Sequence, residues 1–337
     1  MATFFNKVIA FFMTLLTMMP WSGMAAKKNA ENFRVVAYVV GNTFANAERI
    51  DDTHFSQVTD AILFGVATYD EQGEVTLAEN FETVLENLRN AIGENKTRLH
   101  LNILGPGYTI QSDDWNEQMK DQSKHNNKAF ASGKLEQNIK DVLVKYDFDG
   151  LFFDYEYPVT KADWKIFDKF IISLDDCLGD DFMLGSAISA WLTQQSREAI
   201  NRLDFVELMT YDMWDDDGTH SSTVLTKCAV AEMLIRGYKR EQIDLGLPFY
   251  ARPTNHGAYW YDYGSYADKL DEKGFYLDPD TGLTFSFNDY DTIYEKTEWA
   301  VKFGLGGVMV WHYACDVPAD NSLSLFNAIY KAKTDLM

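Results

Sequence analysis

The sequence predicts an α/β fold, a (β/α)8 barrel of the TIM type with a short excursion between the seventh and eighth strands. About eight short apolar or β-branched runs alternate with amphipathic segments, which is the order of a closed parallel barrel covered by helices. The 337 residues contain no Pro/Ser-rich linker, low-complexity tract or sequence repeat. We therefore expect residues 26–337 to form a single barrel domain with elaborated loops.

The candidate strands are short runs of apolar and β-branched residues. In chain order they cover residues 35–40, 61–66, 99–104, 151–153, 183–188, 205–211, 243–247 and 307–311. Between them, apolar side chains recur at helical spacing, as in the series Phe81, Val84, Leu85, Leu88 and Ile92. The longest stretch without a strand-helix unit covers residues 252–289 and is rich in Tyr, Asp and Gly, so we assign it to the excursion.

The amino terminus has the layout of a cleavable signal peptide. Lys7 precedes an apolar run over residues 8–19, and Pro20 and small residues up to Ala25 follow. The run is shorter than the roughly 20 apolar residues that a membrane-spanning helix needs, and no later segment is long enough. We therefore expect removal of residues 1–25, no membrane insertion, and a soluble product that is secreted or periplasmic.

The formal net charge of the chain is −21. This charge opposes binding to nucleic acid and favours neutral or cationic partners, although acidity can also simply keep an exported protein soluble. The three cysteines and six histidines show no metal-like spacing, and the sequence contains no Gly-rich phosphate loop. We expect a monomer without metal or cofactor.

Two acids stand at the end of the apolar run in the middle of the chain. Side chains of a strand alternate between its faces, so Phe152, Asp154 and Glu156 are expected to point the same way. Asp154 and Glu156 then lie about 6–7 Å apart along the strand. Two acids in unequal environments suit proton transfer to a leaving group, whereas an inactive salt-bridge cluster is the structural alternative.

Other polar and aromatic residues fall near the carboxyl ends of the predicted strands, where a barrel of this kind places its chemistry. The candidates for substrate binding are Tyr38, Phe64, Met209, Asp212, Tyr250, Arg252 and Trp311, and Tyr211 is a candidate for catalysis. Core packing is the alternative for Met209. Trp214 lies in a predicted loop, where stacking against a sugar and anchoring of the loop are both expected.

Together these motifs resemble the family 18 glycoside hydrolases, the chitinases and their relatives, over most of the chain after the leader. The family signature Asp-x-x-Asp-x-Asp-x-Glu is matched by Asp149, Asp154 and Glu156, but Phe152 replaces its middle Asp. Residues 209–212 are similar to the Met-x-Tyr-Asp of the sixth strand, residues 246–252 to the seventh-strand segment, and residues 306–311 to the eighth strand. Residues 102–105 depart from the Ser-x-Gly-Gly pattern of the third strand.

The resemblance implies a retaining hydrolysis of β-1,4-linked N-acetylglucosamine chains in which the substrate supplies its own nucleophile. It assigns Glu156 as general acid and base, and Asp154 as the group that binds the acetamido N–H. Asp149 belongs to the same catalytic signature. Tyr211 would bond the acetamido oxygen, and Trp311 would stack beneath the sugar. The expected partner is chitin or another oligosaccharide that contains N-acetylglucosamine.

The position of Phe152 leaves three functions open. The first is a secreted chitinase-type hydrolase, and the second is an endo-β-N-acetylglucosaminidase that cuts N-glycan cores with the same acid. The third is an inactive protein that binds chitin oligosaccharides. Our hypothesis is that the Phe152 ring points into the barrel below Asp154, fills volume there and cannot accept a proton.

Overall fold

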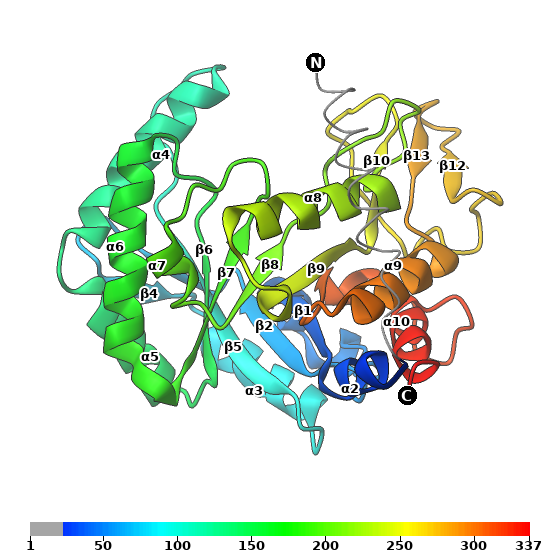
Figure 1. Cartoon of the computed structure of the whole chain (residues 1–337), viewed down its shortest axis with the longest axis horizontal. Coiled ribbons are helices and arrows are strands. Elements are labelled where there is room, and N and C mark those ends of the chain that lie inside the picture. Colours follow the sequence, from blue (N-terminus) through cyan, green and yellow to red (C-terminus); the bar gives the residue numbers. More distant parts are fainter. Residues whose placement is uncertain (1–22) are drawn as a thin grey trace. The chain divides into compact units, whose positions relative to one another are not determined.

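A computed structural model of the chain describes residues 23–337, and its contacts divide these residues into two compact units (Figure 1). We call residues 23–38, 51–59 and 208–337 the terminal unit, and residues 39–50 and 60–207 the central unit. The predicted signal peptide lies outside the described residues except for its last three positions. Its cleavage, the export of the protein and the single domain therefore stay predictions.

The central unit contains five of the eight predicted barrel strands. They are β2 (Asp60–Phe64), β5 (Arg98–Leu104), β6 (Gly150–Asp154), β7 (Met183–Ile188) and β8 (Phe205–Leu208), whose last residue begins the third segment of the terminal unit. Neighbours β2 and β5, β5 and β6, and β6 and β7 pair in parallel. A hairpin of β3 (Ala67–Tyr69) and β4 (Val75–Leu77) was not predicted and adds an antiparallel edge.

The helices of the central unit follow its strands in the expected alternating order. They are α3 (Phe81–Ile92), α4 (Trp115–Phe130), α5 (Leu135–Lys145), α6 (Lys161–Leu178) and α7 (Arg197–Ile200), with short 3-10 turns η1 (Gly41–Phe44), η2 (Ala47–Arg49) and η3 (Gly179–Asp181). All five residues predicted to form the apolar face of α3 are buried. Helix α6 starts in a capping box, because Thr160 and Asp163 bond each other's backbone N–H groups.

The two faces of β6 pack against different partners, as its alternation of side chains predicts. Phe153 faces helices, with ring centroids 5.7 Å from Phe167 and 5.1 Å from Phe170 of α6. Phe152 faces strands, with its centroid 4.6 Å from Phe205 of β8. All five residues of β6 are buried, so the strand fixes Asp154, its last residue, in a rigid frame.

The terminal unit contains the three remaining barrel strands, β1 (Arg34–Val40), whose last two residues belong to the central unit, β9 (Ile243–Pro248) and β14 (Gly307–Trp311). Strand β14 lies between the other two and pairs with both in parallel. The helices of this unit are α2 (Gly23–Asn32), α8 (Thr223–Arg236), α9 (Tyr290–Phe303) and α10 (Leu325–Thr334), with 3-10 turns η4 (Arg240–Gln242) and η5 (Tyr313–Cys315).

The predicted excursion between the seventh and eighth strands is confirmed and has its own small sheet. Its four antiparallel strands lie in the order β11 (Tyr261–Asp262), β10 (Tyr250–Pro253), β13 (Thr284–Ser286) and β12 (Phe275–Leu277). Figure 1 shows this sheet in yellow and orange, between β9 and α9 along the chain.

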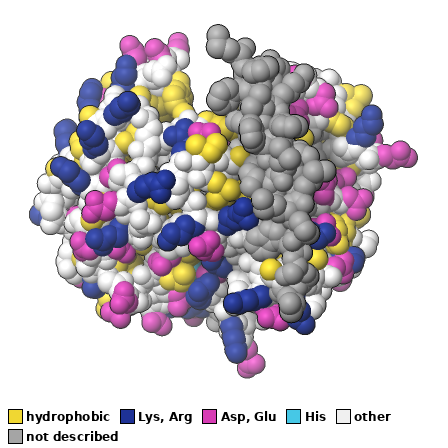
Figure 2. All heavy atoms as spheres, viewed as in Figure 1, with side chains coloured by type: hydrophobic (Ala, Val, Ile, Leu, Met, Phe, Trp, Pro, Cys, Tyr) yellow, Lys and Arg dark blue, Asp and Glu magenta, His cyan; other side chains and the backbone are white. Residues whose placement is uncertain are grey.

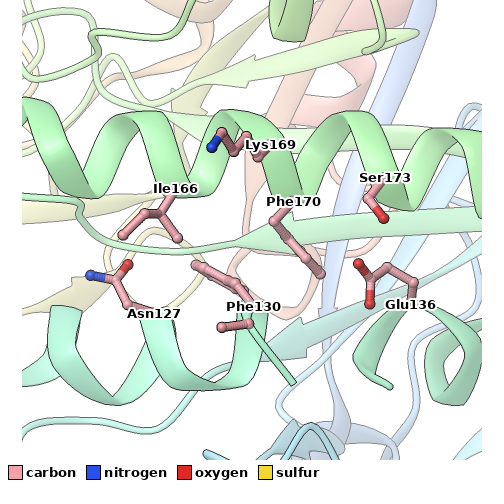
Figure 3. A pocket seen from close by; sticks show the side chains of 8 residues that line it. Asn127, Phe130, Glu136, Ile166, Lys169, Phe170 and Ser173 are labelled. Atoms are coloured by element: carbon pink, nitrogen blue, oxygen red, sulfur yellow. The ribbon is translucent and has the colours of Figure 1, made fainter. Parts of the chain in front are cut away.

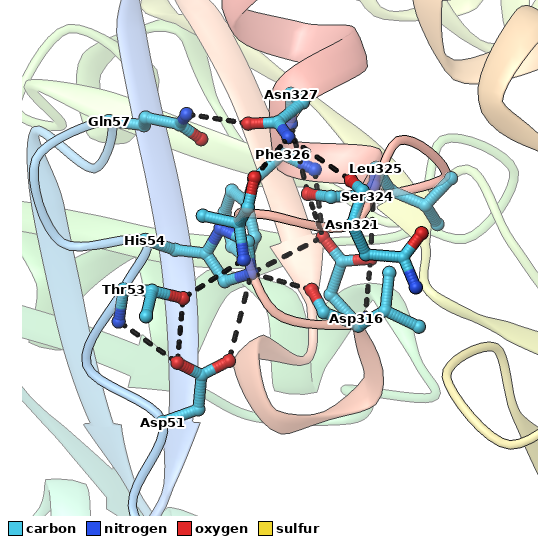
Figure 4. A network of polar contacts seen from close by, with 12 residues as sticks. Asp51, Thr53, His54, Gln57, Asp316, Asn321, Ser324, Leu325, Phe326 and Asn327 are labelled. Atoms are coloured by element: carbon cyan, nitrogen blue, oxygen red, sulfur yellow. Dashed lines mark hydrogen bonds and ion pairs between the residues drawn. The ribbon is translucent and has the colours of Figure 1, made fainter.

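A buried polar network connects the segment after β14 to the start of α10 (Figure 4). The Asp316 carboxylate accepts hydrogen bonds from the backbone N–H groups of Leu325 and Phe326 and from the Ser324 hydroxyl, each at 2.9 Å. These bonds satisfy donors that the first turn of a helix leaves free. The network therefore fixes the chain that follows Trp311.

On the face shown in Figure 2, basic and acidic side chains are interspersed. Within residues 23–337, no helix combines the length and the apolar character that crossing a bilayer requires.

Candidate active site

The two acids of the predicted pair lie in unequal environments at the carboxyl end of β6. Asp154 is buried, whereas Glu156 follows in a loop and is exposed. The Oδ1 atom of Asp154 has no hydrogen-bond partner among the described residues. Burial, and then the negative charge of Glu156, raise the pKa of Asp154 well above its usual range. This pair therefore retains a proton at pH values at which ordinary carboxyl groups have lost theirs.

Phe152 lies two residues before Asp154 on the same face of β6 and is fully buried. Its ring centroid lies 5.0 Å from that of His100 and 4.6 Å from that of Phe205. Gly185 of β7 leaves room for the ring, because a Cβ atom there would lie only 2.3 Å from Phe152 Cε1. An apolar ring thus fills the position directly before Asp154 on this face.

Tyr69 of β3 is a neighbour of Asp154 that the sequence did not reveal. Its buried hydroxyl donates a hydrogen bond of 2.5 Å to Asn126 Oδ1 of α4. Burial, followed by the charges of Tyr155 and Asp154, raises the pKa of Tyr69 well above its usual value. The residue lies in the unpredicted hairpin β3–β4, and no sequence pattern placed that hairpin beside β6.

Asp149, predicted as part of the catalytic signature, lies at the opposite end of β6 from Asp154. It immediately precedes β6, and its Oδ2 atom accepts a hydrogen bond of 2.7 Å from the backbone N–H of Leu99. Five steps of about 3.3 Å along the strand separate it from Asp154, about 16 Å in all. The structure therefore gives Asp149 a role in pairing β6 with β5. Phe64 lies at the carboxyl end of β2, as predicted, and is half-buried.

In the terminal unit, the structure brings together the predicted residues Asp212, Tyr250 and Arg252. The Asp212 carboxylate accepts hydrogen bonds from the Tyr250 hydroxyl at 2.8 Å and from Arg252 Nε and Nη2 at 2.7 and 2.8 Å. Burial raises the pKa of Asp212, but the hydrogen bonds and charge of Arg252 and the hydrogen bond from Tyr250 outweigh it and hold the pKa well below its usual range. Asp212 is therefore a fixed negative charge that orients two side chains.

The backbone around Asp212 is held by His220, which the sequence analysis did not select. The Asp212 N–H donates a hydrogen bond of 2.9 Å to Nε2 of His220, whose side chain is fully buried. Asp212 itself has a positive φ of 54°. Trp214 pairs with His220 in an isolated β-bridge and stacks on His256 with centroids 4.7 Å apart. These contacts favour the loop-anchor interpretation of Trp214.

Aromatic rings form a row in the terminal unit. Tyr38 of β1 and Trp311 of β14 have centroids 5.1 Å apart, and Trp260 stacks between His312 at 5.8 Å and Tyr250 at 5.3 Å. Trp260 remains 37% exposed, so its ring is available for stacking on an apolar face of a ligand. Trp260 and His312 were not among the predicted binding residues, because only the fold of the excursion places Trp260 between Tyr250 and His312.

Tyr211 and Met209 follow β8 and are both half-buried. Gly246 of β9 permits the close approach of this segment, because a Cβ atom there would lie 2.5 Å from the Leu208 carbonyl oxygen and 3.1 Å from Tyr211 Cε1. The Thr210 hydroxyl donates a hydrogen bond of 2.5 Å to the carbonyl oxygen of Gly246. The predicted catalytic Tyr211 is therefore set directly against β9.

Comparison with known proteins identifies the family. The sequence profile of the "Glycosyl hydrolases family 18" matches residues 34–316, most of the chain. The chain belongs to this family. A chitinase-named protein of Margaritifera margaritifera is 26% identical over 225 residues, in a match that covers 57% of this chain and 46% of the relative. The chain spans less than half the length of the curated relatives that it matches.

Solved structures of family 18 members confirm the (β/α)8 barrel. The chitinase ChiB of Flavobacterium johnsoniae superposes with a TM-score of 0.71 at 24% identity, covering 90% of this chain and 95% of its own. Catalytic domain 2 of an Ostrinia furnacalis Group II chitinase gives a TM-score of 0.67 at 18% identity, covering 89% and 96%. That domain was solved as a mutant in complex with (NAG)5.

The described residues of this family 18 chain contain no metal cluster and a further groove. Within residues 23–337, no group of three or more His, Cys, Asp or Glu side chains is arranged to hold a metal ion. An open groove of about 380 Å³ lies in the helical layer of the central unit (Figure 3). It is lined by residues of α4, α5 and α6, among them Phe130, Glu136 and Phe170, and contains none of the predicted site residues.

Proposed function

We propose that this family 18 protein is a chitinase-type glycosidase that hydrolyses β-1,4-linked N-acetylglucosamine chains with retention of configuration. The observation that carries the proposal is the pair at the end of β6. Exposed Glu156 is accessible to a substrate, while buried Asp154 has a raised pKa and an unpartnered oxygen among the described residues. Because the pair keeps a proton when ordinary carboxyl groups have lost theirs, it can supply through Glu156 the proton that general acid catalysis requires.

In the proposed first step, Glu156 donates a proton to the glycosidic oxygen and the bond from that oxygen to the anomeric carbon breaks. The acetamido oxygen of the same sugar attacks the anomeric carbon, which gives a cyclic oxazolinium ion and an alcohol. Asp154 accepts a hydrogen bond from the acetamido N–H and stabilises the positive charge. Water then attacks the anomeric carbon, the bond from that carbon to the acetamido oxygen breaks, and the proton of the water goes to the Glu156 carboxylate, which restores the enzyme.

From the terminal unit we assign Tyr211 to the acetamido oxygen and Trp311 to the apolar face of the sugar. Tyr38 supports the Trp311 ring, and Asp212 orients Tyr250 and Arg252 for contacts with hydroxyl groups. The (NAG)5 complex of the Ostrinia furnacalis domain and the chitinase name of the Margaritifera margaritifera relative support the choice of substrate.

A binding protein without turnover is a second candidate, and Phe152 is the observation that favours it. Its ring leaves no acidic side chain at the position that the family signature gives to a second proton-sharing Asp. Asp154 then has no acid below it on the strand, so its cycle of protonation depends on Glu156 alone. If Asp154 cannot change its protonation state during the reaction, the protein still has the groups that bind the sugar but does not cleave it.

The test incubates the wild-type protein and Glu156→Gln with chitin oligosaccharides and with a high-mannose glycopeptide, and products are identified by mass spectrometry. We expect the wild type alone to cleave the oligosaccharides. Release of the glycan from the glycopeptide would instead assign the protein to the N-glycan class. Binding of the oligosaccharides without cleavage of either substrate would establish the second candidate.

A further inference from the structure

A buried lysine lies behind the segment that carries Tyr211 and Asp212. Lys296 of α9 is fully buried, and its Nζ atom donates hydrogen bonds to the carbonyl oxygen of Ser221, to Ser221 Oγ at 3.0 Å and to Asn288 Oδ1 at 2.5 Å. Three acceptors match the three donors of an ammonium group.

Two of these acceptors are on Ser221, the last residue of the segment 210–221, and the third is on Asn288, which bonds His220 of the same segment. The Ser221 hydroxyl donates in turn to the Thr210 carbonyl, and the Ser221 N–H donates to the carbonyl oxygen of Met213 at 2.7 Å. Asn288 Nδ2 donates to the His220 carbonyl oxygen at 3.0 Å. Lys296 therefore reaches both ends of the segment through one hydroxyl, and it reaches His220 through one amide.

His220 connects this network to the site. Its Nε2 atom accepts the backbone N–H of Asp212, and the Thr210 residue that Ser221 bonds is the direct neighbour of Tyr211. Two hydrogen-bonded routes thus run from Lys296 to the backbone on either side of Tyr211. All of these residues belong to the terminal unit.

An ordinary packing role does not explain a lysine at this position. Within the described part of the chain, the partners of Nζ are neutral oxygens, and no carboxylate pairs with it. Burial lowers the pKa of Lys296 to about 7, while the more distant charge of Glu295 acts in the opposite direction. An apolar side chain of similar length would avoid this desolvation. The position therefore requires the hydrogen-bond donors of the Lys296 ammonium group.

We propose that Lys296 is a positioning residue that clamps the segment 210–221 and so sets the Tyr211 hydroxyl for the acetamido group of the substrate. This inference rests on the proposed function for the role of Tyr211. The clamp itself is independent of that function. It makes Lys296 a residue that acts on the reaction through Tyr211, without contact to the sugar.

The first experiment measures the clamp by hydrogen exchange with mass spectrometry. Lys296→Met keeps the length of the side chain and removes its donors. We expect faster exchange in peptides covering residues 210–221 and unchanged exchange in the strands β1, β9 and β14. Lys333→Met is the matched control, because Lys333 is also partly buried in this unit but donates to the Phe33 carbonyl. Unchanged exchange in residues 210–221 would overturn the clamp.

Should Lys296→Met fail to fold, Ser221→Gly tests the same route. It removes the hydroxyl that connects Lys296 to Thr210, and glycine accepts the positive φ of 52° at this position. Faster exchange confined to residues 210–221 is again expected, and normal exchange there would contradict the proposal.

The second experiment is a double-mutant cycle with Tyr211→Phe, read as kcat and KM on a chitin oligosaccharide. We expect Lys296→Met to lower kcat about tenfold or more in the wild type, with KM changed less than about threefold, and to have little effect once Tyr211 has lost its hydroxyl. Additive losses would show that Lys296 does not act through Tyr211. If the wild type shows no turnover, the proposed function fails, whereas the exchange experiment still decides the clamp.

Discussion

Asp154 in the central unit and Asp212 in the terminal unit are the same residue type in opposite environments. Asp154 is buried, its Oδ1 atom lacks a hydrogen-bond partner among the described residues, and its pKa is raised. The Asp212 side chain is 41% exposed, accepts bonds from Tyr250 and Arg252, and has a lowered pKa. The difference shows that the hydrogen-bond donors around a carboxyl group, more than its place after a barrel strand, decide whether its pKa is raised and it stays protonated or its pKa is lowered and it stays charged.

The largest expected effect is that of Asp154→Asn. The change removes a group that shares its proton with Glu156, so we expect kcat on chitin oligosaccharides to fall about 10²-fold or more. The fall is measured by steady-state kinetics. Asp149→Asn is the control, because Asp149 bonds Leu99 at the other end of β6 and should leave kcat within about threefold. Equal losses in both variants would contradict the placement of Asp149 away from the reaction.

Phe152→Asp should add a second acidic side chain to the buried surroundings of Asp154. A second buried carboxyl group beside Asp154 would share its proton, so the acid limb of the pH profile of kcat should move by about one pH unit. The KM for the oligosaccharide should change less than this limb. Phe152→Leu is the control, since it changes the volume without adding an acid. A profile that does not move, together with lost binding, would count against the role that we give to Phe152.

Gly185→Ala tests the packing that places Phe152 under Asp154. The added methyl group would meet the Phe152 ring at 2.3 Å, so we expect the free energy of unfolding to fall by about 1–3 kcal/mol. Chemical denaturation measures the change. The same substitution in a Phe152→Leu background should have a smaller effect, because the smaller side chain leaves room. An equal loss in both backgrounds would show that another neighbour causes the strain.

The sequence predicted the position of Asp154 but did not predict all the hydrogen-bond partners of Asp212. The strands could be predicted because each is a short apolar run, and the signature on β6 placed Asp154 and Glu156 at its end. The partners of Asp212 include His220, which comes from a loop, and the platform beside Tyr250 depends on Trp260 and on the fold of the excursion. These contacts form between loops, where no periodic pattern reports direction. The motif match groups Asp149 with Asp154 and Glu156, but it does not show that Asp149 bonds Leu99 at the start of β6.

The smallest expected effect concerns the fixed charge of Asp212. Its pKa is lowered in the folded protein, so its stabilisation is complete above the ordinary pKa of 3.8 and is lost as pH falls below that value. We expect Asp212→Asn to lower the free energy of unfolding at pH 7 by about 1 kcal/mol, a figure that allows for solvent screening. At pH 3 the difference between variant and wild type should be smaller, and thermal unfolding at both pH values measures it.

Asp335→Asn is the matched control for this last prediction. Asp335, which directly follows α10, also has a side chain that is 41% exposed, and it pairs with Lys331 at 2.6 Å. Each aspartate accepts a tyrosine hydroxyl, from Tyr294 at 2.9 Å for Asp335 and from Tyr250 at 2.8 Å for Asp212. Lys331 contributes a single flexible ammonium, whereas Arg252 binds Asp212 through two nitrogen atoms. Asp335→Asn should therefore cost less than Asp212→Asn at pH 7. If the two costs are equal, the fixed geometry around Asp212 adds nothing beyond an ordinary surface ion pair, and the contrast with Asp154 reduces to burial alone.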